Sequence, residues 1–252
     1  MKTVVGWQFA MKKIAGRAWL LIGIAGIALL TGCATTGPSA NPKDPWEPYN
    51  RDMTRFNETI DSAVLKPVAT AYKTVTPAVV RTGVSNFFSN LTQPWTALNG
   101  AWQLKGEVAA VSFLRFSVNF FFGFGGVLDM ASEIHLDRYQ EDFGQTLGRW
   151  GVPTGPYFVL PIYGPSTLRD AMAFGVESQA DLIGQLNDGA GYESLYVLRA
   201  LELRANLLRA GEVLDEAALD KYTFARDVFL QRRESQIFDG LAPEPKDFPV
   251  EK

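Results

Sequence analysis

The amino terminus constrains this chain most, because it carries an export signal that ends at the only cysteine. Lys2, Lys12, Lys13 and Arg17 form a basic region before the uncharged apolar run 18–30. This is the layout of a secretory signal peptide, and the run is too short for a settled transmembrane helix. The run ends at Leu30-Thr31-Gly32-Cys33, which resembles a bacterial lipobox. In such a motif, cleavage before the cysteine leaves its sulfur and its new amino group acylated.

We therefore predict a signal peptide over residues 1–32 and a lipid anchor on Cys33. A stray cysteine behind an ordinary export signal is the alternative. Position, flanking small residues and uniqueness all favour the anchor. Ala34 follows the cysteine instead of Asp, which by resemblance to bacterial sorting behaviour favours the outer membrane of a Gram-negative cell, on its periplasmic side.

Charge limits the partners of the mature chain. The full sequence has 24 Lys and Arg against 27 Asp and Glu, and four of the basic residues leave with the signal, so 20 bases face 27 acids and the net charge becomes −7. Such a chain lacks the basic excess that neutralises nucleic-acid phosphates or binds anionic lipid electrostatically. Membrane attachment therefore rests on the acyl chains, each buried methylene of which contributes about 0.8 kcal/mol.

Composition divides the remainder into a tether, one body and a tail. Residues 33–43 are small, polar and interrupted by prolines, and residues 239–252 combine three prolines with charges. No linker or repeat of 20 to 50 residues divides residues 44–238. We expect a single, mainly α-helical domain there.

Periodicity places the helices within this domain. Asp44-Pro45-Trp46-Glu47 predicts a capped helix start, and Pro67 and Pro77 predict breaks. Further apolar stripes predict a helix that ends before Pro94 and two late helices around residues 195–208 and 222–229. The best strand candidate is residues 157–160.

The segment from Gly106 to Leu128 is unusually rich in phenylalanine. Helix is favoured over strand by the Ala- and Leu-rich start and by the stripe spacing, although residues 115–120 also alternate. The candidate membrane-facing side chains are Phe113, Phe116, Phe120, Phe121, Phe122 and Phe124.

On this helix, Ser112, Arg115 and Asn119 project within about 60° of one another and form a polar stripe. One interpretation makes the stripe the lining of a lipid channel, between lipid and a polar cavity. The other makes it part of an ordinary core, in which Arg115 pairs with a buried carboxylate. Spacing alone leaves the two open.

Residues 142–165 alternate glycine and proline after Trp150, which predicts an ordered loop instead of a helix. Gly151, Pro153 and Gly155 are its candidate channel residues. No glycine there belongs to a phosphate-binding GxxxxGK[ST] pattern, and residues 123–126 lack GxGxxG spacing.

Enzyme and metal chemistry find little support. There is no GxSxG nucleophile elbow, and His135, the only histidine, lies in a charged stretch typical of a solvent-facing side chain. One histidine and one cysteine make a metal site with those ligands improbable. We expect no metal, no cofactor and no catalysis, and keep a lipid hydrolase as a remote alternative.

The mature sequence resembles the MlaA (VacJ) family of bacterial outer-membrane lipoproteins. The matching stretches are Asp44-Pro45-Trp46-Glu47-Pro48-Tyr49-Asn50-Arg51, Phe56-Asn57, Gly123-Phe124-Gly125-Gly126-Val127-Leu128-Asp129, and residues 142–165 continuing to Leu168-Arg169-Asp170. The resemblance covers nearly all of the mature chain before about Asp188 and only helical character after it.

This resemblance implies a ring-like helical domain held in the periplasmic side of the outer membrane beside a trimeric porin. It also implies a function: removal of misplaced phospholipids from the outer leaflet through an amphipathic channel to a soluble periplasmic carrier, which maintains lipid asymmetry. A structural lipoprotein that braces porins would use the same anchor and aromatic surface, and is the alternative.

Overall fold

The computed structural model describes residues 41–185 and 189–241. The predicted signal peptide, Cys33, all but the end of the tether and most of the tail lie outside these residues.

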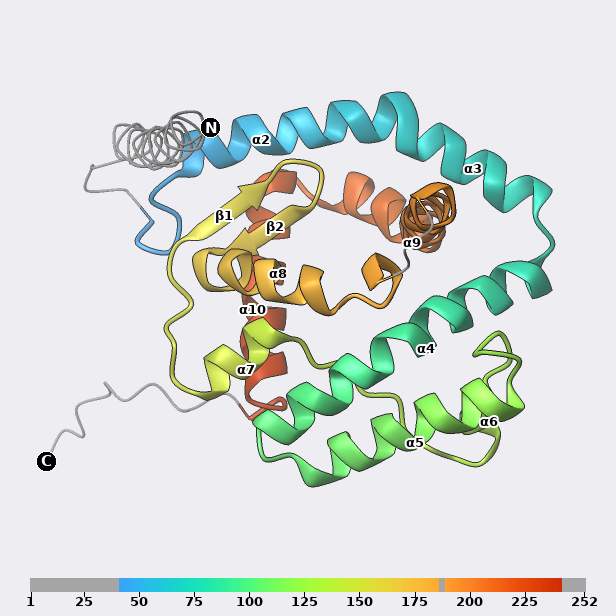
Figure 1. Ribbon diagram of the computed structural model, residues 1–252. Coiled ribbons are helices and arrows are strands. Elements are labelled where there is room, and N and C mark those ends of the chain that lie inside the picture. Colours follow the sequence, from blue (N-terminus) through green and yellow to red (C-terminus); the bar gives the residue numbers. More distant parts are fainter. Residues whose placement is uncertain (1–40, 186–188, 242–252) are drawn as a thin grey trace, which may run out of the picture.

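The chain first follows the perimeter of the molecule (Figure 1). α2 (Glu47–Ile60), the π-helical turn η2 (Asp61–Leu65) and α3 (Lys66–Val75) form one side. α4 (Ala78–Trp102) returns along another side, and α5 (Gly106–Phe122) folds back against it. The remaining elements are α6 (Met130–Glu133), α7 (Phe143–Arg149), β1 (Tyr157–Leu160), β2 (Gly164–Thr167), α8 (Leu168–Ala180), η3 (Ile183–Gln185), α9 (Gly189–Ala217) and α10 (Lys221–Ile237).

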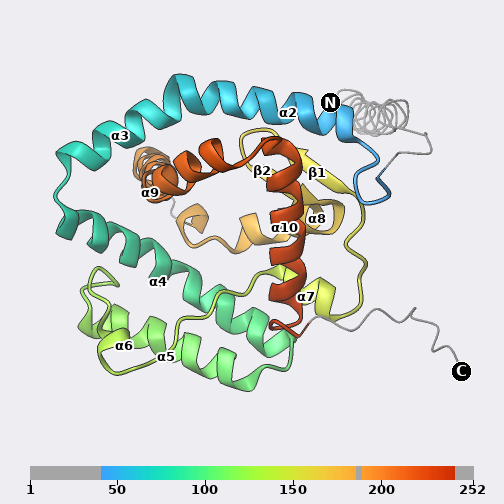
Figure 2. The same ribbon diagram turned by 180° about the vertical axis from the view of Figure 1, so that it is seen from behind.

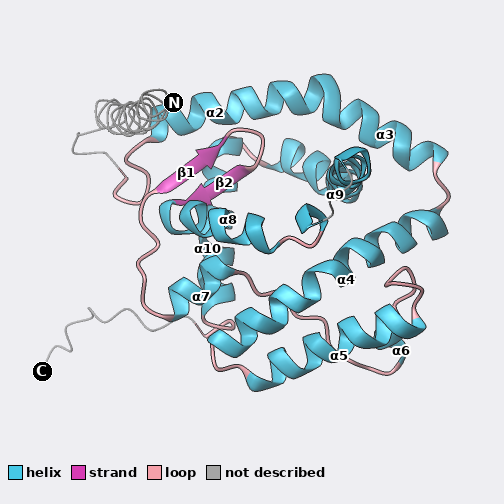
Figure 3. Ribbon diagram, viewed as in Figure 1, coloured by secondary structure: helices cyan, strands magenta, loops and turns pink. Residues whose placement is uncertain are grey.

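Together these elements make a ring-like helical fold, which confirms the predicted fold class. α7 and α10 close the end opposite the α3–α4 corner, whereas α8 and α9 project inside the perimeter in both views (Figures 1 and 2). β1 and β2 pair antiparallel, with Tyr157 opposite Thr167 (Figure 3). A small core of Tyr157, Val159 and Tyr222 joins this hairpin to α10.

The predicted helix cap at Asp44 is wrong. Helix α2 begins at Glu47, its N-cap is Trp46, and no side chain caps it. Pro48 occupies its first turn, where the missing N–H has no intrahelical partner to lose. Asp44 is instead fully buried, and its carboxylate accepts a hydrogen bond from Arg226 of α10. A buried carboxylate requires hydrogen-bond donors around it, and α10 supplies one here.

The proline predictions were partly right. Pro77 separates α3 from α4, but Pro67 follows the π-helical turn without ending the helical run. Pro94 lies inside α4, so the predicted break there is wrong. An internal proline costs roughly 3 kcal/mol in isolation. The close packing of α4 against α5 offsets this cost. The two helices approach so closely at Gly100 that a Cβ there would lie 2.9 Å from the backbone nitrogen of Ala109.

Other element predictions are confirmed. Residues 106–122 are helical, residues 157–160 form β1, and no α-helix continues past Arg149 into the glycine- and proline-rich stretch. The two late helices also form, as α9 and α10. Strand β2 was not predicted, because its sequence Gly-Pro-Ser-Thr carries almost no strand propensity and pairs only through the hairpin.

Candidate functional site

The polar stripe of α5 faces the interior of the protein. Ser112, Arg115 and Asn119 are at most 5% exposed. Arg115 donates to both carboxylate oxygens of Asp129, at 2.7 and 3.0 Å, and also contacts the Leu136 carbonyl. The stripe therefore packs beneath the segment 123–138, which returns over α5.

Asp129 is the centre of this cluster. Its carboxylate accepts from Asn119 at 3.0 Å, from the Ser132 hydroxyl at 2.6 Å and from Arg138 at 2.6 Å. Burial alone would raise the pKa of Asp129, but the hydrogen bonds from Ser132, Asn119 and Arg138 and the charge of Arg115 outweigh burial and hold it well below its ordinary value. The carboxylate is therefore firmly ionised.

This geometry corrects the channel interpretation of Ser112, Arg115 and Asn119. Side chains on the wall of an open channel would be accessible to solvent, whereas these three are enclosed, and Arg115 has the carboxylate partner that the core alternative required. The Ser112 hydroxyl is buried without a hydrogen-bond partner in the described structure. The stripe fixes the segment 123–138 onto α5.

The exposed side of α5 and the turn that follows it carry the phenylalanine surface. Five of the six candidate side chains are 51% to 81% exposed. The sixth, Phe116, is half-buried against Phe120, with the two ring centroids 5.7 Å apart. The exposed five are Phe113, Phe120, Phe121, Phe122 and Phe124. An apolar surface of this kind in one place is typical of a protein or membrane contact.

An apolar groove of about 740 Å³ lies where α4 begins. Its walls are residues 78–87 of α4, residues 127–129 and Leu198 of α9. The segment 127–129 can approach α4 this closely because of Gly83, on which a Cβ would lie 2.9 Å from the Val127 side chain. Thr82, Asn86 and Asp129 provide the few polar groups. Sequence reasoning missed this groove, because its walls come from three segments that are far apart in the sequence.

Gly151, Pro153 and Gly155 line a second, smaller cavity of about 410 Å³ together with residues of α10. Gly151 and Gly155 have φ of +90° and +70°. Only glycine adopts such angles readily, so a side chain at either position would strain the backbone. The channel role of the loop stays a prediction.

At the wall of this cavity, which includes Arg169 and Arg233, ion pairs join α7, α8 and α10. Arg233 binds Asp142 at 2.6 Å and Asp170 at 2.8 Å, and Asp170 also accepts from Arg169 at 3.1 Å. Burial lowers the pKa of Arg233, but the hydrogen bonds and charges of Asp142 and Asp170 outweigh it and raise the pKa. A Cβ on Gly144 would lie 2.4 Å from this network, so the glycine is required for its close approach.

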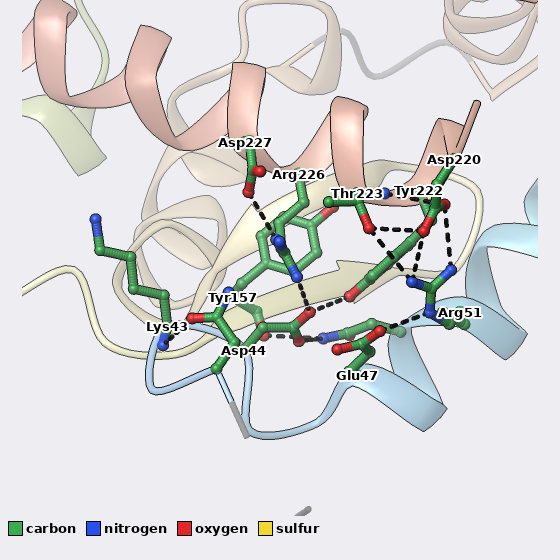
Figure 4. Close-up of polar contacts among 12 residues, drawn as sticks. Lys43, Asp44, Glu47, Arg51, Tyr157, Asp220, Tyr222, Thr223, Arg226 and Asp227 are labelled. Carbon is green, nitrogen blue, oxygen red and sulfur yellow. Dashed lines mark hydrogen bonds and ion pairs between the residues drawn. The ribbon is translucent and has the colours of Figure 1, made fainter. Parts of the chain in front are cut away.

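A further polar network joins the start of the domain to α10 (Figure 4). Buried Asp44 accepts from Asn50 at 2.8 Å and from Arg226 at 3.1 Å, and it contacts the Tyr222 hydroxyl. Burial, followed by the bond to Asp44, raises the pKa of that hydroxyl. Beside it, Arg51 binds the α10 N-cap Asp220 at 2.7 Å. The chain just after the tether is therefore bonded to the C-terminal helix.

His135 is exposed, as predicted. Among the residues that the structure describes, no group of three or more His, Cys, Asp or Glu could hold a metal ion. Within the same residues, no helix is long and apolar enough to cross a membrane.

The fold is similar to that of a solved protein structure. A solved structure from work on the structural basis for maintenance of bacterial outer membrane lipid asymmetry matches with a TM-score of 0.68 and 33% identity. The match covers 77% of this chain and 98% of that one.

Sequence comparisons identify the family. A family model for the MlaA lipoprotein matches residues 42–236. The chain is 34% identical over 229 residues to the intermembrane phospholipid transport system lipoprotein MlaA of Escherichia coli (strain K12), covering 89% of this chain and 90% of that protein. Its counterpart in Haemophilus influenzae is 32% identical over 236 residues, or 90% and 94% of the two chains. The chain belongs to the MlaA lipoprotein family.

Proposed function

We propose that this protein removes misplaced phospholipids from the outer leaflet of the outer membrane and passes them to a soluble periplasmic carrier. Its relatives are named for intermembrane phospholipid transport, and its structural neighbour was studied for outer-membrane lipid asymmetry. A transport lipoprotein of this family has no need of a catalysed reaction, so we propose that the protein is not an enzyme.

The apolar groove at the start of α4 is the observation that carries this proposal. Its volume of about 740 Å³ lies in the range of ligand sites, which are mostly apolar with a few polar groups. Acyl chains would lie against Val79, Val80 and Leu198. Thr82 and Asn86 would offer polar partners to a headgroup, which otherwise loses its hydrogen bonds to water.

The phenylalanine surface of α5 supports a position at the membrane. Exposed aromatic rings gain free energy when they leave water for lipid or for an apolar protein surface. We propose that Cys33 tethers the chain to the periplasmic side of the outer membrane and that α5 contacts lipid or a trimeric porin. No nucleotide-binding motif supplies energy, so transfer is passive and is directed by the acceptor.

A matched pair of charged substitutions tests the groove. Val80 lines it and is 51% exposed, whereas Val75 is 78% exposed and is not among the lining residues. Neither Val80→Glu nor Val75→Glu should unfold the protein, because surface substitutions usually change stability by less than about 0.5 kcal/mol.

We expect Val80→Glu to raise outer-leaflet phospholipid, since a carboxylate in the acyl path is desolvated by each passing chain, and Val75→Glu to leave it at the wild-type level. The measurement is labelling of intact cells with a membrane-impermeant amine reagent, normalised to protein abundance. Equal lipid levels for both variants, both at normal abundance, would contradict a lipid path through the groove and favour the porin brace.

A further inference from the structure

The free edge of strand β1 is covered by side-chain amides of α2. Asn50 and Asn57 lie seven residues apart, two helical turns, and so share one face of the helix. The Asn50 Oδ1 accepts from the Val159 N–H at 2.9 Å, and its Nδ2 donates to the Tyr157 carbonyl at 3.1 Å. Asn50 thus occupies the place of a backbone amide in a third strand.

Asn57 does the same at the turn that follows β1. Its Nδ2 donates to the Leu160 carbonyl at 2.9 Å, and its Oδ1 accepts from the Ile162 N–H at 2.7 Å. The two bonds flank Pro161, which has no N–H of its own. One carboxamide therefore fixes the backbone of the β1–β2 turn on both sides.

The turn held in this way is unfavourable by itself. Ile162 has φ of +68°, which is an outlier for a β-branched residue, and its side chain is 66% exposed. Tyr163 beside it is 70% exposed. Tight hairpins usually place Asn or Gly at such positions. Strained residues that the surrounding structure holds in place cluster at ligand-contacting sites.

The turn also has a defined position in the ring. It projects inside the perimeter in both views, toward α9 (Figures 1 and 2). The Tyr163 ring packs on Phe174 of α8, with centroids 4.7 Å apart.

We propose that the turn residues Ile162 and Tyr163 contact the acyl chains of a phospholipid within the ring, and that Asn57 is the positioning residue that holds them there. This rests on the proposed transport function and deepens it. The apolar Ile162 side chain suits a methylene chain, and Tyr163 offers an apolar ring with a hydroxyl that can remain hydrated.

Ile162→Gly tests the proposal, because it separates transport from stability. Glycine relieves the positive φ, so a purely structural role predicts an equal or higher melting temperature with unchanged transport. The proposal predicts an equal or higher melting temperature together with lipid removal slowed by roughly three- to tenfold per molecule, since one apolar contact is lost. Ile134→Gly, at another exposed isoleucine in a loop, should leave transport unchanged.

A direct probe decides the case even if Ile162→Gly lowers protein levels. The full acylated protein is reconstituted in vesicles of phosphatidylethanolamine carrying a diazirine on one acyl chain, and adducts are mapped by mass spectrometry. Wild-type adducts within residues 157–167, reduced in Asn57→Ala, support the proposal. Adducts confined to α5, or equal turn adducts in Asn57→Ala, overturn it. If wild-type protein fails to lower outer-leaflet phospholipid in cells, the proposed function itself fails.

Discussion

Replacing Arg115 by methionine should destabilise the whole domain. The Arg115 side chain is 2% exposed and that of Asp129 15%. Removing one partner of a buried ion pair costs about 3 to 5 kcal/mol. We expect about 3 kcal/mol, the lower end, because Asp129 keeps its hydrogen bonds from Asn119, Ser132 and Arg138. For a domain of this size, that corresponds to a melting temperature lower by roughly 6 to 12 °C.

Arg138→Met is the matched control, because Arg138 binds the same carboxylate from a side chain that is 40% exposed. An exposed ion pair contributes about 1 kcal/mol or less, so this variant should melt within about 4 °C of wild type. Thermal unfolding followed by circular dichroism measures both. Equal losses for the two variants, or an Arg115→Met protein as stable as wild type, would refute a buried structural pair and reopen the channel interpretation of α5.

Three further predictions concern the lipid anchor, the glycine-containing loop and the dependence of stability on pH. Cys33→Ala should abolish metabolic labelling with fatty acid and displace the protein from the membrane; label that persists would exclude the anchor, since the chain has no other cysteine. Gly151→Val should lower lipid removal more than it lowers the melting temperature, because its φ of +90° opposes a side chain at a loop that we propose lines the lipid path; parallel losses would indicate a structural loop. The pKa of Asp129 is lower in the folded than in the unfolded protein, so its stabilising effect is complete above about pH 4 and is lost as pH falls below that value toward the folded pKa. In Asp129→Asn, the free energy of unfolding should therefore fall less between neutral and acidic pH than in wild type. The same pH dependence in both proteins would contradict the prediction.

Local signals in the sequence predicted the helical fold and the position of the aromatic surface. The Ala- and Leu-rich start of residues 106–122 and the spacing of their polar stripe predicted the helix, and the phenylalanines predicted its exposed surface. The same spacing could not decide what the polar stripe faces, because Asp129 meets Arg115 only after the chain turns back through residues 123–128. Periodicity describes one element, whereas the partner of a buried charge depends on tertiary structure.

The remaining misses have the same origin. Asp44 has the local pattern of a helix cap, yet its partner Arg226 is 182 residues away. Pro94 has the local pattern of a helix stop, yet the packing of α4 on α5 carries the helix through it. The apolar groove is made by three segments that are distant in sequence, so no single stretch announces it.

Outer-leaflet phospholipid in intact cells tests the central claim most directly. Cells that lack this gene should expose more amine-reactive phospholipid at their surface than the parent strain. A plasmid copy of the wild-type gene should restore the parental level, and a Cys33→Ala copy should not. An unchanged surface phospholipid level in the deletion strain would contradict a role in phospholipid removal.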